Sequence, residues 1–453
     1  MTARPATSPE PRGHGIPFAE AVRVWTRIGL QSFGGPAGQI AVMHRVLVEE
    51  KRWIGEDRFL HALNYCMLLP GPEAQQLATY IGWLLHGTRG GLVAGLLFIL
   101  PGFVAILGLS LVYALWQHVP LATGIFLGLK AAVLALVVDS VRRIASRALR
   151  GPDHTVLAVL AFIALFAFEV PFPIVIATAA AVGLMRAKVA VSSPPAGHAG
   201  LLDAHLDAGT LNVAPPSLAR SLRVLAIGLI LWAAPVVAVA ALVGPDTVFV
   251  TLGLFFSNVA VVTFGGAYAV LAYVAQAAVD TWGWLTPGEM MDGLGLAETT
   301  PGPLIMVVQF VGFLAGHRNP GALDPMTSAV LAACITSWVT FAPCFLWIFL
   351  GAPYVEALRG NRALTAALSA ITAAVVGVIA NLAFWFAFHV LFSGVTETHL
   401  GPIRLLVPHG VQLGPTLIAI AAAVALLRYR VSLGLVLSGS ALLGLAWHLY
   451  GGP

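Results

Sequence analysis

The sequence predicts an all-α polytopic membrane protein built from two homologous halves that form an inverted repeat. Three observations lead to this class. The 453 residues are 58% hydrophobic and only 10% charged, with a mean hydropathy of +0.89, whereas a soluble domain carries roughly 25% charged residues. The apolar runs are long and continuous, which disfavours the alternating pattern of a membrane β-barrel. The third observation is an internal repeat of glycine and proline motifs.

Runs of about 20 apolar residues predict the membrane spans. The first run is weak because Arg23 and Arg27 interrupt it, and the fifth and sixth are separated only by a short hairpin. A polar stretch at 189–221 is expected to link an N-terminal domain of residues 1–188 to a C-terminal domain of residues 222–453. The expected spans are 18–40, 61–85, 91–116, 121–141, 155–169, 171–188, 222–243, 248–272, 290–316, 327–350, 364–391, 413–427 and 432–450.

The two halves repeat the same motifs at a constant spacing. The Ser-Phe-Gly-Gly segment at 32–35 returns 231 positions later as Thr-Phe-Gly-Gly at 263–266, and Pro-Gly-Pro at 70–72 returns at 301–303. Further along, matching residues are 242 positions apart, so we expect 11 extra residues in the loop near 316–324. Glycine and proline residues that interrupt hydrophobic segments at corresponding positions of two halves are the best sequence indication of a transporter's substrate site.

Counting the elements predicts how the halves are oriented. Six precede the linker, and the span at 222–243 has no partner in the first half, so seven crossings separate equivalent elements and the second half is inverted. With the N-terminus inside, the expected outer loops at 117–120, 169–173 and 244–247 contain no Lys or Arg, as the positive-inside rule requires. The loop at 44–58 disagrees, because it holds four basic residues although the count places it outside. The first element is therefore either a crossing or a re-entrant or interfacial segment.

The Pro-Gly-Pro motifs predict broken helices. Pro70 and Pro72 interrupt an apolar run, and proline inside a helix removes a hydrogen bond and clashes with the preceding turn. A new helix is expected to begin near Pro72, with bare backbone N–H groups that attract anions. Thr299 and Thr300 precede the matching motif and are suited to cap its helix or to bind a ligand. The alternative is that both motifs are ordinary kinks of packed helices.

The glycine pairs and the intramembrane charges each have two interpretations. The glycines permit close approach to a ligand or close packing of helices. Lys130, in the middle of an apolar run, suits an anionic ligand or a counter-ion to Glu73 or Asp139, and the alternative is snorkelling. Glu73 is also placed to satisfy a helix dipole, and Asp139 to form an interfacial ion pair with nearby arginines. The candidates for coupling are Glu73, Asp139 and Glu298.

The candidate substrate-binding residues come from both halves. No Cys/His metal spacing, P-loop or nucleophile elbow is present, so we expect no metal and no cofactor. The three cysteines all lie in apolar stretches and are expected to be core residues. No signal peptide and no nucleic-acid-binding pattern is apparent. The candidates are Phe33, Gly34, Gly35, Pro70, Gly71, Pro72, Glu73, Gln75 and Lys130 in the first half, and Phe264, Gly265, Gly266, Thr299, Thr300, Pro301, Gly302 and Pro303 in the second.

These motifs, together with Trp53 and its repeat partner Trp284, resemble the chromate ion transporter (CHR) family in its long two-domain form. The resemblance covers residues 24–380. It implies a multi-pass protein of the bacterial inner (plasma) membrane that exports chromate, handled as a sulfate analogue, and confers chromate resistance. It implies chromate or sulfate and membrane lipid as partners, with a homodimer left open. Since the chain carries no nucleotide-binding domain, a secondary transporter driven by protons or a counter-anion is expected, and not an enzyme.

Two other functions remain open from the residues alone. A carrier for sulfate or another oxyanion needs the same helix starts and the same lysine. A membrane-embedded enzyme acting on a lipid phosphate also needs converging helix starts, together with a base beside several arginines, and that cluster is not visible in the sequence.

Overall fold

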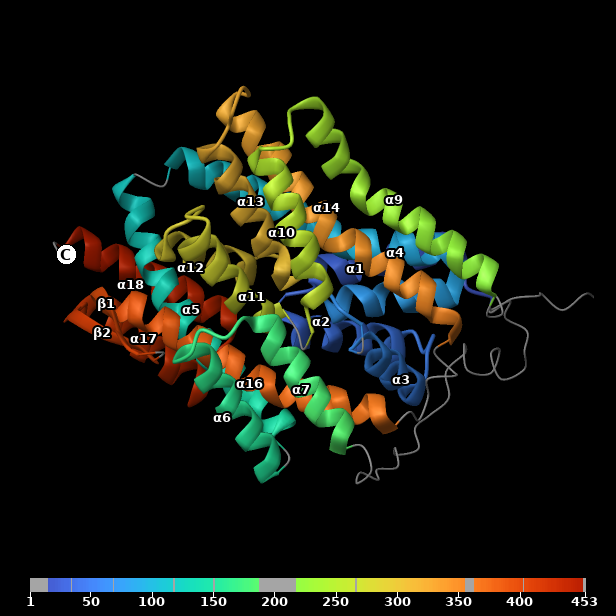
Figure 1. Cartoon of the computed structure of the whole chain (residues 1–453), viewed down its shortest axis with the longest axis horizontal. Coiled ribbons are helices and arrows are strands. Elements are labelled where there is room, and N and C mark those ends of the chain that lie inside the picture. The colour runs from blue at the N-terminus through green and yellow to red at the C-terminus, as the bar shows by residue number, and fades with distance from the viewer. Residues whose placement is uncertain are drawn as a thin grey trace, which may run out of the picture.

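The computed structural model is almost entirely helical, and its helices pack into one bundle (Figure 1). Its largest cluster of buried apolar side chains draws on both sequence halves, with Ile106 and Val133 from the first and Phe256 and Val339 from the second. The structure describes residues 15–33, 35–67, 69–116, 119–149, 151–186, 217–264, 267–354, 362–401 and 403–450.

The first two helices form a hairpin. Helix α1 (Phe18–Gln31) ends at Ser32, and α2 (Gly35–His44) continues into a π-helical turn at Arg45–Glu50. Lys51 Nζ lies 2.7 Å from Glu20 Oε1 at the open end of the pair, so the two helices run antiparallel. The expectation of one span at 18–40 is therefore wrong. The physical reason is a chain reversal, which Gly35 allows by adopting a φ of +71°.

A second hairpin follows, and its tip is the Pro-Gly-Pro motif. Helix α3 (Glu56–Cys66) leads to that motif, and α4 (Glu73–Trp116) begins after it. Glu56 accepts a hydrogen bond of 2.6 Å from His44, and the ring of His86 lies 5.3 Å from that of Phe18. Both ends of the hairpin are thus at the base of the first hairpin. The span expected at 61–85 is a reversal and not a crossing.

Helix α4 itself consists of two antiparallel segments, residues 73–85 and 88–116. His86 and Gly87 have non-helical dihedral angles, and Gly87 has a φ of +60°. The two segments pack closely at Gly82. A Cβ added to this glycine would lie only 2.6 Å from the carbonyl oxygen of Gly90. The second segment is one of the helices long and apolar enough to cross a membrane.

The second half repeats both hairpins. Helix α10 (Val248–Val262) pairs with α11 (Ala267–Gln276), and α12 (Pro287–Thr299) pairs with α13 (Val307–Arg318). Arg318 Nη2 lies 2.5 Å from Glu289 at the base of the second pair. The spans expected at 248–272 and 290–316 are therefore reversals as well. A hydrophobic run has the same composition whether the chain crosses or turns back, so composition alone does not separate the two.

The hairpins remove the disagreement in the basic loops. Because α1 and α2 together return to the side on which they began, residues 44–58 share a side with the N-terminal end of α1, and their basic residues then obey the positive-inside rule. The helices of the bundle outside the hairpins are α5 (Pro120–Ala148), α6 (Pro152–Phe166), α7 (Phe172–Arg186), α9 (Leu218–Leu242), α14 (Pro325–Gly351), α16 (Arg362–Leu391), α17 (Leu413–Leu427) and α18 (Leu433–Leu449).

Equivalent helices of the two halves are antiparallel. The second segment of α4 corresponds to α14 in the repeat, and both are long and apolar enough to span a membrane. Gly91 lies against Phe349, and Gly95 lies against Phe345, four residues later on one helix and four earlier on the other. A two-fold axis that relates antiparallel spanning helices lies in the membrane plane. This arrangement is the inverted repeat that the sequence predicts.

The two halves exchange helices. In Figure 1, α6 and α7 lie beside α16 of the second half, and α17 and α18 lie beside α5 of the first. The contacts are close. A Cβ added to Gly183 would lie 2.5 Å from the carbonyl oxygen of Ala366, and one added to Gly128 would overlap the carbonyl oxygen of Ser440. The halves are therefore interlocked. The expected linker falls mostly in residues 187–216, outside the described residues.

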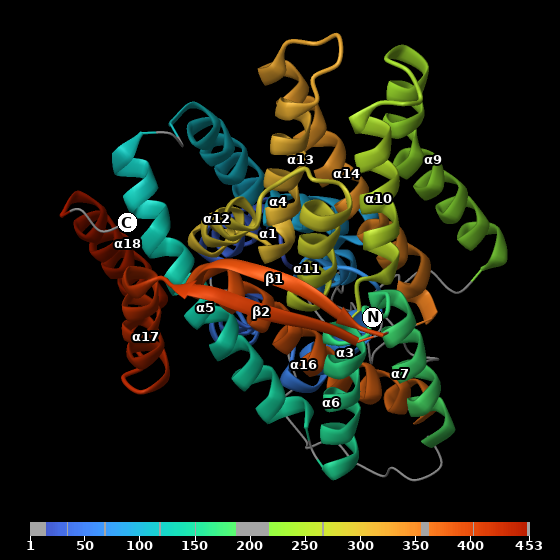
Figure 2. The same cartoon turned by 60° about the vertical axis from the view of Figure 1, so that its left-hand side comes forward.

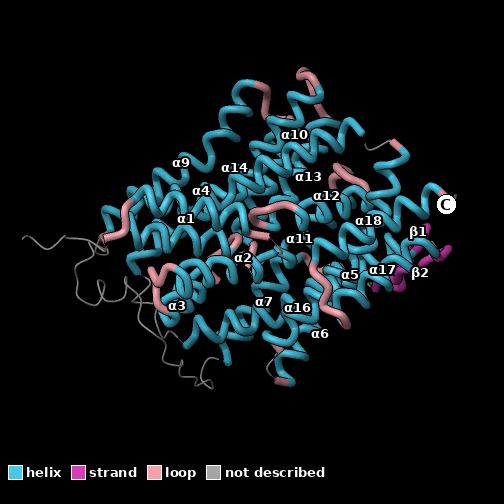
Figure 3. Tube along the Cα trace, turned by 180° about the vertical axis from the view of Figure 1, so that it is seen from behind, coloured by secondary structure: helices cyan, strands magenta, loops and turns pink. Residues whose placement is uncertain are grey.

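A two-stranded sheet connects α16 to α17. It was not predicted from the sequence. Strands β1 (Phe392–Leu400) and β2 (Ile403–Val411) pair antiparallel and form a long hairpin over the helices (Figure 2) at one edge of the molecule (Figure 3). The Arg404 guanidinium is buried, and its Nη1 lies 3.0 Å from Glu169 in the α6–α7 loop. This contact joins the hairpin of the second half to the helix pair of the first.

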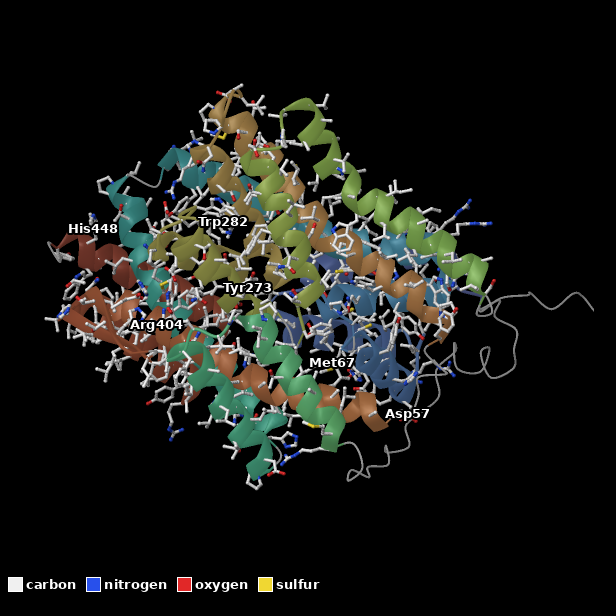
Figure 4. The ribbon with its side chains drawn as sticks, viewed as in Figure 1. Asp57, Met67, Tyr273, Trp282, Arg404 and His448 are labelled. Carbon is white, nitrogen blue, oxygen red and sulfur yellow. The ribbon has the colours of Figure 1, made fainter. Side chains whose placement is uncertain are left out.

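We predict that the bases of the two sets of hairpins face opposite sides of the membrane. Asp57 marks one base and Trp282 the other, and Figure 4 shows them well apart, with Asp57 at the lower right and Trp282 above and to the left of the centre. Cysteine at Asp57 should react with an impermeant maleimide only from the cytoplasmic side, and cysteine at Trp282 only from the opposite side, in a protein whose own cysteines are replaced by serine. Cysteine at Arg147 is the control for the cytoplasmic side. Labelling of both positions from one side would contradict the inverted arrangement.

Candidate functional site

The tips of the hairpins lie together in the interior, where each half completes the backbone hydrogen bonds of the other. The Gly71 N–H donates to the carbonyl oxygen of Thr263 over 2.8 Å, and the Gly302 N–H donates to that of Ser32 over 2.8 Å. Each pair maps onto the other by the 231-residue repeat, so the bonds are related by a pseudo-two-fold axis. Backbone groups at this depth have no lipid partner, and the exchanged bonds satisfy them.

Both glycines of the Pro-Gly-Pro tips are held in conformations that L-residues avoid. Gly71 has a φ of +123° and Gly302 a φ of +100°. A Cβ on Gly71 would lie 2.8 Å from Cys344 Sγ on α14, and one on Gly302 would lie 3.0 Å from the Cα of Gly102 on α4. Gly102 and Cys344 are themselves equivalent in the repeat. The motif therefore has glycine at its centre for two reasons, dihedral angle and close packing.

The first Pro-Gly-Pro motif starts a helix, as the sequence predicts. Helix α4 begins at Glu73, directly after Pro72, so the N–H groups of its first turn have no partner within the helix. Three side-chain oxygens around this start, Glu73 Oε2, Gln75 Oε1 and Gln76 Oε1, are buried without a hydrogen-bond partner among the described residues. Buried polar atoms in this state require water or a ligand. This helix start is the part of the site with the most unsatisfied polar groups.

The second Pro-Gly-Pro motif differs from its counterpart. The hydroxyls of Thr299 and Thr300 donate to the carbonyl oxygens of Leu296 and Ala297, over 2.8 and 3.1 Å. They therefore close the end of α12, and the expectation that they cap the following helix is wrong. Thr299 remains exposed, so its hydroxyl is accessible to a ligand.

The Phe-Gly-Gly segments form the tips of the other two hairpins, α1–α2 and α10–α11. The Phe33 side chain is 46% exposed, so this tip is open at its surface. Gly35 lies beside a tyrosine of the second half, since a Cβ there would be 3.7 Å from the hydroxyl of Tyr268. Gly34, Gly265 and Gly266 lie outside the described residues.

Two of the predicted coupling residues lie near one arginine. Glu298, at the end of α12, is buried and accepts a hydrogen bond from the Tyr268 hydroxyl. The nearby cation is Arg143 of α5, whose Nε lies 3.0 Å from Asp139 Oδ2. The ion pair expected for Asp139 is therefore present. Glu73 belongs to the other hairpin, and it has no ion pair among the described residues.

Lys130 has a different partner from the ones expected. Its Nζ lies 3.2 Å from Asp292 Oδ2, and the Tyr113 hydroxyl donates to the same oxygen over 2.8 Å. The expectation that Lys130 neutralises Glu73 or Asp139 is therefore wrong, and the inward ion pair does not fit snorkelling. Asp292 precedes Thr299 by seven residues of α12, or about 10 Å along the helix. Lys130 thus lies beyond the tips, toward the base of the α12–α13 hairpin.

Comparison with known proteins agrees with the geometry. The family model described as "Chromate transporter" matches residues 19–184 and 250–445. The chain belongs to the chromate transporter family. The chain is 35% identical over 356 residues to the chromate transport protein of Pseudomonas aeruginosa, covering 78% of this chain and 77% of the relative. It is 26% identical over 433 residues to the chromate transport protein of Cupriavidus metallidurans, covering 94% and 92%. No solved structure matches the chain.

The family match covers the sequence that builds the site. The two matched ranges contain all four tips and leave out the whole of α9, the helix without a repeat partner. The resemblance inferred from the Phe-Gly-Gly and Pro-Gly-Pro motifs is therefore confirmed, and the chain is a multi-pass membrane protein of a transporter family. The roles of individual site residues stay predictions.

Sequence reasoning missed several residues at the tips. The Gln39 side chain of α2 donates to the carbonyl oxygen of Gly302 over 2.6 Å, and Gln309 of α13 donates to that of Phe103 over 3.1 Å. Both glutamines lie within expected spans, where a polar residue is itself a signal. Asp292 was missed although an acid in the expected span 290–316 meets the same criterion that selected Lys130.

We predict that Gly302→Ala destabilises the folded protein by roughly 1–3 kcal/mol, because the added methyl group meets Gly102 and the backbone dihedral is strained. Gly108→Ala, on the same helix as Gly102 but with no heavy atom within 4 Å of the new Cβ, is the matched control and should have no such effect. Thermal unfolding in detergent measures both. Equal melting temperatures for the two variants would show that the tip tolerates a side chain.

Proposed function

We propose that this chain is a secondary transporter that exports chromate across the bacterial inner membrane and thereby confers chromate resistance. Chromate is a tetrahedral dianion and a structural analogue of sulfate. The observation that carries the proposal is the exchanged pair of tip hydrogen bonds, Gly71 to Thr263 and Gly302 to Ser32. Membership of the chromate transporter family supports the choice of anion.

The chemistry of the first helix start suits an oxyanion. A helix N-terminus carries about half a positive charge, and its free N–H groups bind anionic oxygens. At α4 these groups lie inside the protein beside Gln75 and Gln76. Their amide nitrogens donate to Thr79 Oγ1 and to the carbonyl oxygen of Pro70 over 3.0 and 2.7 Å, and their oxygens have no partner among the described residues. Each Gln amide can present either its NH₂ or its oxygen to the site. A desolvated dianion needs this density of dipoles to replace its water.

The inverted hairpins suit alternating access. One pair of hairpins has its base on the cytoplasmic side and the other pair on the opposite side, and hydrogen bonds between the tips join the two pairs. Breaking one exchanged bond while keeping the other would open a path to one side only. Symmetry-related gates of this kind are the general device of transporters with inverted repeats.

A carrier for sulfate or another oxyanion is the second candidate, because the same helix start would bind any tetrahedral anion. The lipid-phosphate enzyme has less support. Among the described residues near the tips, the arginine beside Glu298 is already paired with Asp139, so it offers no cluster of unpaired cations for a phosphate.

Everted membrane vesicles test the proposed function. Vesicles that contain the protein should accumulate chromate when energised, and vesicles without it should not, because export from the cell corresponds to uptake into an everted vesicle. Unlabelled sulfate at increasing concentration then distinguishes a chromate carrier from a general oxyanion carrier. Absence of energised uptake of either anion would contradict the proposal.

Gln75→Leu should raise the KM for chromate at least tenfold, because it removes the polar amide group beside the helix start while preserving the side-chain volume. Ser110→Ala is the control. Ser110 is also buried on α4, but its hydroxyl bonds only to the carbonyl oxygen of Ile106 within the same helix. The measurement is initial uptake rate in everted vesicles at matched expression. A KM unchanged by Gln75→Leu would remove this residue from the site.

A further inference from the structure

A polar cavity lies between α4, α5 and α12, apart from the tips. Its volume is about 150 Å³, and the residues that line it include Tyr113, Thr123, Lys130, Thr286, Glu289 and Asp292. One water molecule needs roughly 10–15 Å³ of such space, so the cavity has room for several waters or a small anion. By the positive-inside assignment it lies on the outer side of the tips, toward the base of the α12–α13 hairpin.

Asp292 is the buried acid of this cavity, and it is only half satisfied. The residue is 3% exposed, and its Oδ2 accepts from both Lys130 and Tyr113. Its Oδ1 is buried with no hydrogen-bond partner in the described part of the chain. Burying a carboxylate with one oxygen that lacks a hydrogen bond costs free energy. A competing ligand can therefore displace Asp292 from Lys130.

The charges around the cavity are balanced. Tyr113 faces Asp292 from α4, Lys130 from α5, and Glu289 from α12 itself. Arg318 of α13 is committed to Glu289, at 2.5 Å, and to the carbonyl oxygen of Trp284. Within the described part of the chain, Lys130 is therefore the cation of the cavity whose ion-pair partner is Asp292 alone, and its side chain is 30% exposed. An oxyanion in the cavity would have this ammonium as its main partner.

The ion pair of Lys130 with Asp292 joins the two halves, and the symmetry-related position has no such pair. The positions equivalent to Lys130 and Asp292 are Thr372 and His61, and the position equivalent to Glu289 is Arg58. The tips follow the two-fold symmetry, whereas this cavity occurs on one side only. A feature confined to the outer side can give a symmetrical carrier different binding properties at its two faces.

We propose that this cavity is an oxyanion exit site in which the anion replaces Asp292 as the partner of Lys130. In the empty protein the Asp292 carboxylate holds the ammonium. An anion that leaves the tips binds the ammonium, and the return of Lys130 to Asp292 expels it to the outer side. The direction of movement rests on the proposed function, whereas the binding of an oxyanion to Lys130 does not.

The proposal predicts opposite effects of the two partners. Asp292→Asn removes the competing charge and keeps the side-chain shape, so sulfate should bind at least tenfold more tightly and leave more slowly. Lys130→Thr, which introduces the residue found at the equivalent position of the other half, should weaken binding at least tenfold. If the ion pair had only a structural role, both variants would instead be less stable, and their affinity for sulfate would be unchanged.

The experiment measures equilibrium binding of sulfate to the full-length protein in lipid nanodiscs, and then chromate uptake into everted vesicles. Lys130→Thr combined with Asp292→Asn has no unpaired buried charge, so it should fold, and it serves as the control that lacks the site. Tighter binding by Asp292→Asn together with a lower maximal rate supports the proposal. Equal affinities of the wild type and both single variants would overturn it. Sulfate binding that follows the proposal without any chromate transport by the wild type would instead overturn the proposed function.

Discussion

The fold depends on the requirement that backbone polar groups inside a membrane find partners within the protein. The chain stops being helical at the Ser-Phe-Gly-Gly and Pro-Gly-Pro motifs, in the middle of otherwise apolar runs. Lipid offers no hydrogen bonds at that depth. The amides of Gly71 and Gly302 are satisfied by carbonyls of the opposite half, so neither half completes its own tips. Both halves are needed to make the broken helices stable.

The exchange of helices extends the same dependence to the periphery. The α6–α7 pair packs on α16, and the α17–α18 pair packs on α5, through glycines that bring the backbones into contact. Without a hydrophobic driving force between helices in lipid, close packing of small residues is a main source of association energy. Motion between the two states of a carrier must therefore move each exchanged pair together with the helix on which it packs.

Symmetry and asymmetry have separate places in the molecule. The exchanged tip bonds obey the two-fold relation, and such bonds favour neither face. The charged groups do not obey it. Glu298 with Tyr268, and Lys130 with Asp292, have no acidic or basic counterparts of the same kind at the equivalent positions of the other half, while Glu73 corresponds to Leu304. In a carrier of this design, the repeated backbone at the tips would allow the protein to open to either side. Side chains that are not repeated would then set the preferred direction of transport.

The sequence by itself determined the membrane class, the family and the repeat, because composition and motif spacing can be read along the chain. It also predicted the inverted relation of the halves, but from a count of crossings that included two reversals. The prediction still holds because removing two crossings leaves the number odd. The sequence also placed a helix start after Pro72 and paired Asp139 with an arginine. Only the tertiary structure decided that the first, second, eighth and ninth expected spans are reversals. An apolar run is equally hydrophobic whether it crosses or turns back, and the decision rests on glycine dihedral angles and on contacts between distant helices. The partner of Lys130 was decided in the same way. Lys130 and Asp292 are 162 positions apart in the sequence, and they meet only when α12 of one half packs on α5 of the other.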